Sequence, residues 1–187
     1  CRIKMLVLSE RQDMEVIPQD VEDCYYCMGH IDDLTLKTVM ECVDVGFSPT
    51  LWEGFDLPLA EMQYLYQHMY VYDLGAHPEV AAHPFFLCGN EKEAAEKICQ
   101  ELAGELPVEE TELHQSLENF HQKFSWKKCA HTILRQMQKD MVLSGVLFID
   151  VTNACHDTAN SGVMRVTRKI ARQMQKKMET VFVIWDE

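Results

Sequence analysis

The sequence predicts an α/β fold, in which a Rossmann-like parallel sheet is flanked by helices. Short apolar runs of strand length alternate with helical patterns, as in the strand expected at 25–28, the helix at 32–43 and the strand at 45–48. This alternation is typical of parallel sheets with helical crossovers. The chain has 187 residues, 47% of them apolar, which suits one domain or one and a half.

The first part of the chain supplies most of the expected elements. We expect strands at 3–8, 25–28, 45–48, 69–74 and 85–88, and helices at 32–43, 59–68, 91–103, 109–120 and 126–141. The run at 3–8 is continuously apolar, which favours a buried strand. Asp32 and Asp33 are acids of the kind that begin a helix, and apolar residues follow them at helical spacing.

The composition changes at Leu143, where a second segment begins. A strand is expected at 146–151, a polar loop at 152–161, a basic helix at 162–178 and a strand at 181–185, which together make a βαβ unit. We therefore divide the chain into segments 1–142 and 143–187. Either the two segments belong to separate modules, or the strands of the second complete the sheet of the first.

Charge and composition exclude several classes of function. The net charge of −13 argues against nucleic acid as a partner, because phosphate backbones need a positive face. No apolar run is long enough to span a membrane, and no signal peptide is recognisable. We therefore expect a cytoplasmic protein whose eight cysteines are reduced. The basic stretch 123–177 suits an anionic donor, a lipid-linked acceptor or the surface of the inner membrane.

The segment 43–62 carries the most chemical information. Glu53 and Glu61 are separated by seven residues, with Gly54 and a helix-opening Pro58 between them. The free N–H groups of the helix start attract an anionic phosphate ester, and the glycine lets the backbone approach a ligand. The later glutamate is placed to accept both hydrogen bonds of a ribose diol. The earlier one is placed to bond sugar hydroxyls and to stabilise positive charge at an anomeric carbon.

This segment resembles the C-terminal domain of retaining glycosyltransferases with two Rossmann-like domains, the GT-B architecture of family 4. Further likenesses lie at 29–34, 75–80 and 124–126, in the same order as in that family. The resemblance covers about residues 28–140. It implies a partial GT-B domain that binds a nucleotide-sugar.

The resemblance also implies roles for individual residues. Glu53 would be the catalytic residue that holds the donor sugar, and Glu61 would hold the nucleotide ribose. Gly54, Phe55 and Leu57 would contact the sugar and the phosphates through their backbone. The parent enzyme would transfer a sugar, with retention, to a saccharide or lipid-linked acceptor in bacterial surface polysaccharide synthesis. No metal or other cofactor is expected.

The chain departs from the family pattern in two places. Asp56 stands where the family usually has glycine, and its carboxylate would repel the diphosphate unless it turned to solvent. The family also has an Arg and a Lys, earlier in the domain, that neutralise the diphosphate. No residue before Gly29 matches them.

The second segment resembles the start of the N-terminal domain of the same enzymes. Residues 161–166 are similar to the Gly-Ile-x-Arg-Val that begins the first helix of that domain. Gly162, Arg165 and His156 are therefore our candidates for acceptor or phosphate contacts. Sequence that resembles the C-terminal domain precedes sequence that resembles the N-terminal domain. We therefore expect a piece of a longer protein with glycosyltransferase modules in tandem. Such a piece would have little activity alone, and its open sheet edge would favour a homo-oligomer.

Two other functions stay open. The chain is alternatively a non-catalytic α/β scaffold of a polysaccharide-assembly complex, which Asp56 and the missing cations favour. A redox or metal protein built on Cys24 and Cys27 is a third interpretation. His77 and His30 are interpreted as structural residues.

Overall fold

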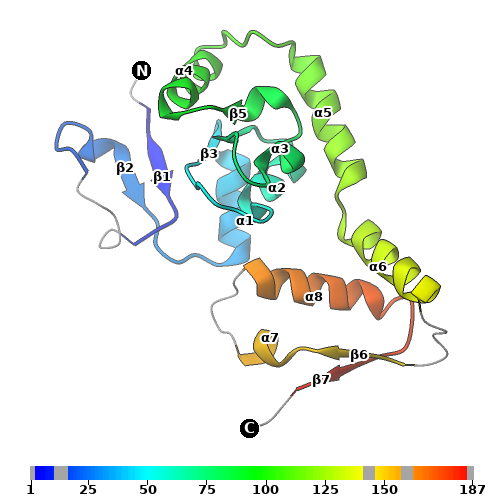
Figure 1. Ribbon diagram of the computed structural model, residues 1–187. Helices are drawn as coiled ribbons and strands as arrows, with labels where there is room; N and C mark the ends of the chain where they lie inside the picture. The colour runs from blue at the N-terminus through cyan, green and yellow to red at the C-terminus, as the bar shows by residue number, and fades with distance from the viewer. Residues whose placement is uncertain (1–2, 11–16, 141–145, 157–161, 185–187) are drawn as a thin grey trace.

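The computed structural model describes residues 3–10, 17–140, 146–156 and 162–184, and it has an α/β architecture with parallel strands (Figure 1). The strands described form three small sheets. The first pairs β1 (Met5–Val7) with β2 (Tyr25–Cys27), the second joins β3 (Gly46–Ser48), β4 (Met69–Tyr72) and β5 (Leu87–Cys88), and the third pairs β6 (Leu147–Asp150) with β7 (Thr180–Val183). A single Rossmann-like sheet therefore remains only an implication of the resemblance.

The helices largely follow the expected order. They are α1 (Asp33–Cys42), α2 (Leu57–Tyr64), α3 (His77–Val80), α4 (Glu91–Leu102), α5 (Glu110–Lys123), α6 (Trp126–Asp140), α7 (Thr152–His156) and α8 (Gly162–Met174). Asp32 caps α1 by accepting hydrogen bonds from the amides of Leu34 and Thr35, as the acids at this position predicted. Asn90 caps α4 in the same way.

The central sheet has helices on both faces because the side chains of β4 alternate between two cores. Met69 and Val71 pack with residues of α1, α2 and α3 and with Phe120 of α5. Tyr70 points to the other face and packs with residues of β5 and α4 and with Leu113 of α5. This arrangement covers the sheet on both faces, as expected for a parallel sheet.

The N-terminal strand corrects one expectation. The run 3–8 forms β1, but Ile3, Met5 and Leu6 are exposed rather than buried. Figure 1 shows the β1–β2 pair to one side of the central sheet. A continuous apolar run predicts a strand correctly, but it carries no information on whether another layer covers that strand.

The second segment forms its own small unit. Strands β6 and β7 are parallel and are connected through α8, so the predicted βαβ unit is confirmed. Its core consists of Leu147, Met174 and two residues of α6, Ala130 and Leu134. The β6–β7 sheet shares no strand with the central sheet, so the second segment does not complete the first sheet.

Short helices account for most of the differences between the expected and observed elements. The expected loop at 75–84 contains α3, the expected strand at 85–88 begins with a 3-10 turn at Pro84–Phe86, and the polar loop at 152–161 begins with α7. A helix of four or five residues is too short to show the apolar spacing by which a helix is recognised in a sequence. In the described ranges no helix combines the length and the apolar character that crossing a membrane requires.

Candidate functional site

The loop that carries Glu53 lies at the carboxyl ends of the central strands. It leaves β3 and leads into α2, and the turn after β4 lies directly against it. A Cβ atom on Gly75 would be 3.2 Å from the backbone oxygen of Glu53, and Gly75 has a φ of +56°. Both the close approach and the positive φ require glycine here. The carboxyl ends of parallel strands are where α/β proteins bind ligands.

Glu53 and Gly54 are both available to a ligand. The Glu53 side chain is half-buried, and among the described residues it makes no hydrogen bond or ion pair. A Cβ atom on Gly54 would meet nothing within 4 Å, and its φ is not positive. Neither the packing nor the backbone conformation therefore requires glycine at position 54. Open space at this position leaves room for a ligand to approach the backbone.

The next apolar residues of the loop anchor it to the protein. The ring of Phe55 meets Phe124 edge-on, with ring centroids 5.5 Å apart, and Phe124 in turn packs on Phe120 of α5. Leu57 is the first residue of α2 and is half-buried. Their side chains serve packing, which is consistent with ligand contacts made by their backbone.

Asp56 does not take either of the two orientations considered from the sequence. It points neither to an open phosphate site nor to solvent, because its side chain is buried. Its backbone is left-handed with a φ of 55°, and its carboxylate accepts a hydrogen bond from the Leu59 amide at 3.0 Å. The other carboxylate oxygen lies 3.1 Å from Nε2 of His77.

His77 is fully enclosed and bonded through both ring nitrogens. Nδ1 lies 2.7 Å from the carbonyl oxygen of Tyr72 and must donate, because a carbonyl only accepts. The bond between Nε2 and the Asp56 carboxylate therefore requires that one of these two groups carries the proton and donates it to the other. This confirms that His77 is structural, and it explains how a carboxylate is accommodated where the family usually has glycine.

The cap reduces the anion-binding capacity of α2. The amides of Leu59 and Ala60 donate to the side chain and to the backbone oxygen of Asp56, and Pro58 has no amide hydrogen. In the described structure this leaves the Leu57 amide as the one unused donor of the first turn. The row of free N–H groups expected here is therefore largely occupied by the protein itself.

The second segment contacts this site through α8. Nη1 of Arg165 donates to both carboxylate oxygens of Glu61, at 2.8 and 3.0 Å. A Cβ atom on Gly162 would lie 2.9 Å from Cδ1 of Leu57, so the start of α8 touches the start of α2. The structure thus joins four residues chosen separately in two segments. It also brings a cation to a loop that lacked one.

The remaining candidates are His156 and the pair Cys24 and Cys27. His156 is the last residue of α7, and its side chain lies outside the described structure. Cys24 immediately precedes β2 and Cys27 is the last residue of that strand, and both side chains are half-buried. Within the described ranges, no group of three or more His, Cys, Asp or Glu side chains is arranged to hold a metal ion.

A pocket close to the Glu53 loop was not predicted. It has a volume of about 310 Å³, and its wall consists of residues that follow the three central strands: Pro49, Leu51, Tyr72, Leu74, Gly89, Asn90 and Glu91. Each strand is followed by a polar or turn residue in the sequence, and this was the one available signal. The signal is weak because every strand end has it.

A scan against protein-family models, a search of curated proteins and a search of solved structures each gave no match. The likeness to retaining glycosyltransferases therefore rests on the sequence motifs alone.

Proposed function

We propose that this chain contains the donor-binding part of a retaining, nucleotide-sugar-dependent glycosyltransferase. One observation carries the proposal: Glu61 and Leu57, chosen from the donor motif, contact Arg165 and Gly162, chosen from the second segment. These pairs are about 100 residues apart in sequence, so local structure does not bring them together. In this proposal, the two segments correspond to the two domain types that enclose the donor in the resembled family, and the contacts between them support a shared donor site.

The arrangement of Glu61 suits a ribose diol. A carboxylate has about four acceptor positions, and a single nitrogen of Arg165 uses one on each oxygen. The side chain of Glu61 is 37% exposed, so its remaining acceptors are accessible to the two hydroxyls.

The same ion pair supplies positive charge for the diphosphate. The side chain of Arg165 is 19% exposed, and its Nε is buried without a hydrogen-bond partner. Nη1 is engaged by Glu61 and the buried Nε cannot reach a ligand, so Nη2 is the donor that would meet a phosphate oxygen. In this proposal Arg165 replaces the cations that the family carries earlier in its sequence. The Leu57 amide and the loop amides before it complete the phosphate contacts.

The donor sugar then lies at Glu53. The carboxylate, which has no partner among the described residues, bonds the sugar hydroxyls and stabilises the positive charge that develops at the anomeric carbon. The open space at Gly54 accommodates the ring. The acceptor is a saccharide or a lipid-linked saccharide, and the setting is surface polysaccharide synthesis on the inner face of the membrane.

Nucleotide binding tests this proposal. Calorimetric titration with UDP, GDP and ADP should show binding of at least one of them. Glu61→Gln should weaken that binding by about tenfold or more, because hydrogen bonds to a charged group are lost. Glu96→Gln is the matched control, since Glu96 lies on the exposed surface of α4. Equal affinity in Glu61→Gln and in wild type would contradict the assignment.

The scaffold alternative has one observation in its favour. The Asp56 carboxylate, held by His77, occupies amide donors of α2 that a phosphate would otherwise use. The variant Asp56→Gly restores the family's residue and frees the Leu59 amide. Position 56 has a left-handed φ, which is favourable for glycine. If neither wild type nor Asp56→Gly binds any of the nucleotides, the scaffold function is favoured.

A further inference from the structure

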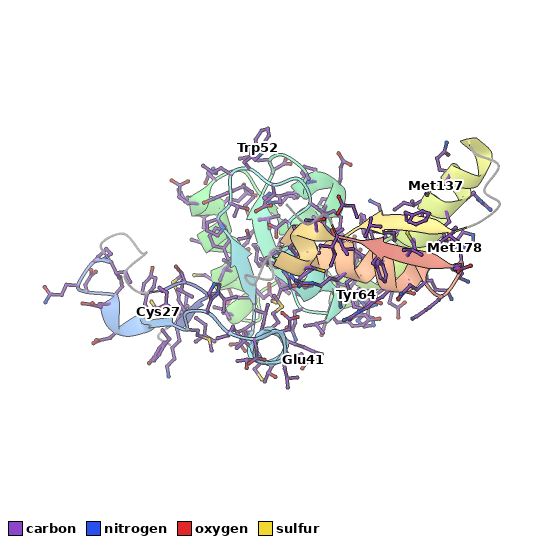
Figure 2. All side chains as sticks on the ribbon, turned by 90° about the horizontal axis from the view of Figure 1, so that it is seen from below. Cys27, Glu41, Trp52, Tyr64, Met137 and Met178 are labelled. Carbon is purple, nitrogen blue, oxygen red and sulfur yellow. The ribbon has the colours of Figure 1, made fainter. Side chains whose placement is uncertain are left out.

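The pocket of about 310 Å³ has an apolar wall on the side of the Glu53 loop. Pro49, Leu51, Leu74 and the ring of Tyr72 form this wall. Leu51 and Leu74 are both exposed, as is Trp52, which follows Leu51 in the chain and has 88% of its surface accessible. Figure 2 shows the Trp52 side chain at the outer margin of the molecule. Grouped apolar side chains left in water around a hollow are characteristic of a binding site.

The polar lining of the pocket comes from the start of α4. Asn90 uses its side-chain oxygen to cap the helix, accepting from the Glu93 amide at 3.0 Å, so its NH₂ group remains free to donate. The carboxylate of Glu91 is exposed and makes no hydrogen bond to any described residue. The Gly89 amide is not available, because it donates to Glu93 at 2.8 Å. This polar wall thus offers an amide donor and a carboxylate acceptor.

The charge of the wall restricts the class of ligand. Among the residues that the structure describes, no Lys, Arg or His lines the pocket, and Glu91 is the one charged residue of its lining. An anion would meet this carboxylate without a compensating cation, so phosphates and nucleotides are disfavoured. The volume lies at the lower end of the range of about 300–1,000 Å³ for small-molecule sites. A small, neutral ligand fits these conditions.

A sugar ring matches both walls at the same time. Its C–H face packs on aliphatic and aromatic side chains such as Leu51, Leu74 and Tyr72. Its hydroxyls accept from the amide of Asn90 and donate to the carboxylate of Glu91. A fully apolar ligand would use only the first wall. We therefore propose that this pocket binds a neutral saccharide.

The position of the pocket identifies that saccharide as the acceptor. Leu51 belongs to the loop that carries Glu53, and Leu74 precedes Gly75, whose Cβ position is 3.2 Å from the Glu53 backbone. The pocket therefore borders the loop where the donor sugar is proposed to lie. The acceptor role rests on the proposed glycosyltransferase function, whereas the saccharide binding itself does not.

Saturation-transfer NMR with glucose, galactose, mannose and their disaccharides, in the absence of nucleotide, tests the binding. At least one neutral sugar should receive magnetisation from the protein. Glu91→Gln and Asn90→Ser should each weaken its binding several-fold, since each removes one hydrogen-bonding group. Serine preserves the cap of α4, so Asn90→Ser should keep the wild-type unfolding midpoint. Glu96→Gln, on the exposed face of the same helix, serves as the control that retains wild-type binding.

Two further measurements distinguish a failure of saccharide binding from a failure of nucleotide binding. Glu61→Gln should weaken nucleotide binding but leave sugar binding intact, so loss of one activity does not imply loss of the other. Glucose 1-phosphate should bind more weakly than glucose because of Glu91. The proposal would be overturned if no neutral sugar received magnetisation from the protein. It would also be overturned if Glu91→Gln and Asn90→Ser bound the sugar as tightly as wild type, or if glucose 1-phosphate bound more tightly than glucose.

Discussion

At the scale of single residues, Asp56 shows how an unfavourable local conformation is stabilised by its surroundings. A left-handed backbone is rare outside glycine, although aspartate and asparagine tolerate it better than most residues. Asp56 adopts it with its side chain buried between the Leu59 amide and His77. The same carboxylate therefore caps α2 and joins the donor loop to α3.

Removing the Asp56 carboxylate should destabilise the protein. We expect Asp56→Ala to lower the free energy of unfolding by about 3 kcal/mol, because it removes a helix cap and leaves His77 buried without its partner. Asp56→Asn should lower it less, since asparagine keeps the cap and tolerates the backbone. Urea denaturation at neutral pH measures both.

The exposed Asp44 supplies the control, and Asp44→Ala should change the free energy of unfolding by less than about 0.5 kcal/mol. If Asp56→Ala were as mild as this control, the Asp56–His77 pair would not stabilise the loop.

At the scale of elements, a buried hydrogen bond fixes α4 on the central sheet. The hydroxyl of Tyr70, a fully buried residue of β4, donates to Glu101 of α4 at 2.6 Å. The second oxygen of that carboxylate lies 2.7 Å from Nδ1 of His68. Burial, reinforced by the bond to Glu101, raises the pKa of Tyr70 well above its ordinary value of 10.0.

This shift predicts a loss of stability in alkali. The folded state keeps Tyr70 protonated at a pH where the unfolded chain has lost that proton. The folded state therefore binds more protons, and the contribution of Tyr70 is complete below about pH 10 and is lost as the pH rises above it. Tyr70→Phe should lower the free energy of unfolding by about 1 kcal/mol at neutral pH and reduce the loss between about pH 9 and pH 11.

Urea titrations at several pH values give this comparison, with Tyr26→Phe as the control because Tyr26 is exposed. If the free energy of unfolding of Tyr70→Phe fell with pH as steeply as that of wild type above about pH 9, another group would dominate the pH dependence.

At the scale of the whole molecule, the contact between α2 and α8 relates the two segments. The central sheet and the β6–β7 unit have separate cores, and Figure 1 shows the two sheets apart from each other. Arg165 and Glu61 form an ion pair between them, and the absence of a side chain at Gly162 allows the helices to approach. The site we propose therefore depends on how these two units dock.

A double-mutant cycle should detect this docking. With Glu61→Gln and Arg165→Ala, we expect a coupling energy of about 0.5 to 1 kcal/mol, which is small because the carboxylate is partly exposed and is screened by solvent. Added salt should reduce it. Thermal or urea unfolding of the four proteins measures the coupling.

The surface pair Lys37–Glu41 is the reference, since it lies within one helix and should show only a few tenths of a kcal/mol. A coupling of zero between Glu61 and Arg165 would mean that the segments do not dock through this pair in solution.

Local rules predicted the elements well and the site only in part. Asp32 and Asn90 satisfy amides within three residues of themselves, so a short stretch of sequence contains the information for the starts of α1 and α4. The short helices α3 and α7 lack such a pattern, and both were expected as loops.

The sequence by itself determined the parallel strand–helix order and the strand, loop and helix that present Glu53 and Glu61, because these follow from interactions between near neighbours. Tertiary structure alone decided that Asp56 is buried against His77, 21 residues away, and that Glu61 meets Arg165, 104 residues away. It also decided that β1 is left exposed. Which side chain or layer faces a residue depends on how the whole chain packs, and that packing is not encoded in any short segment.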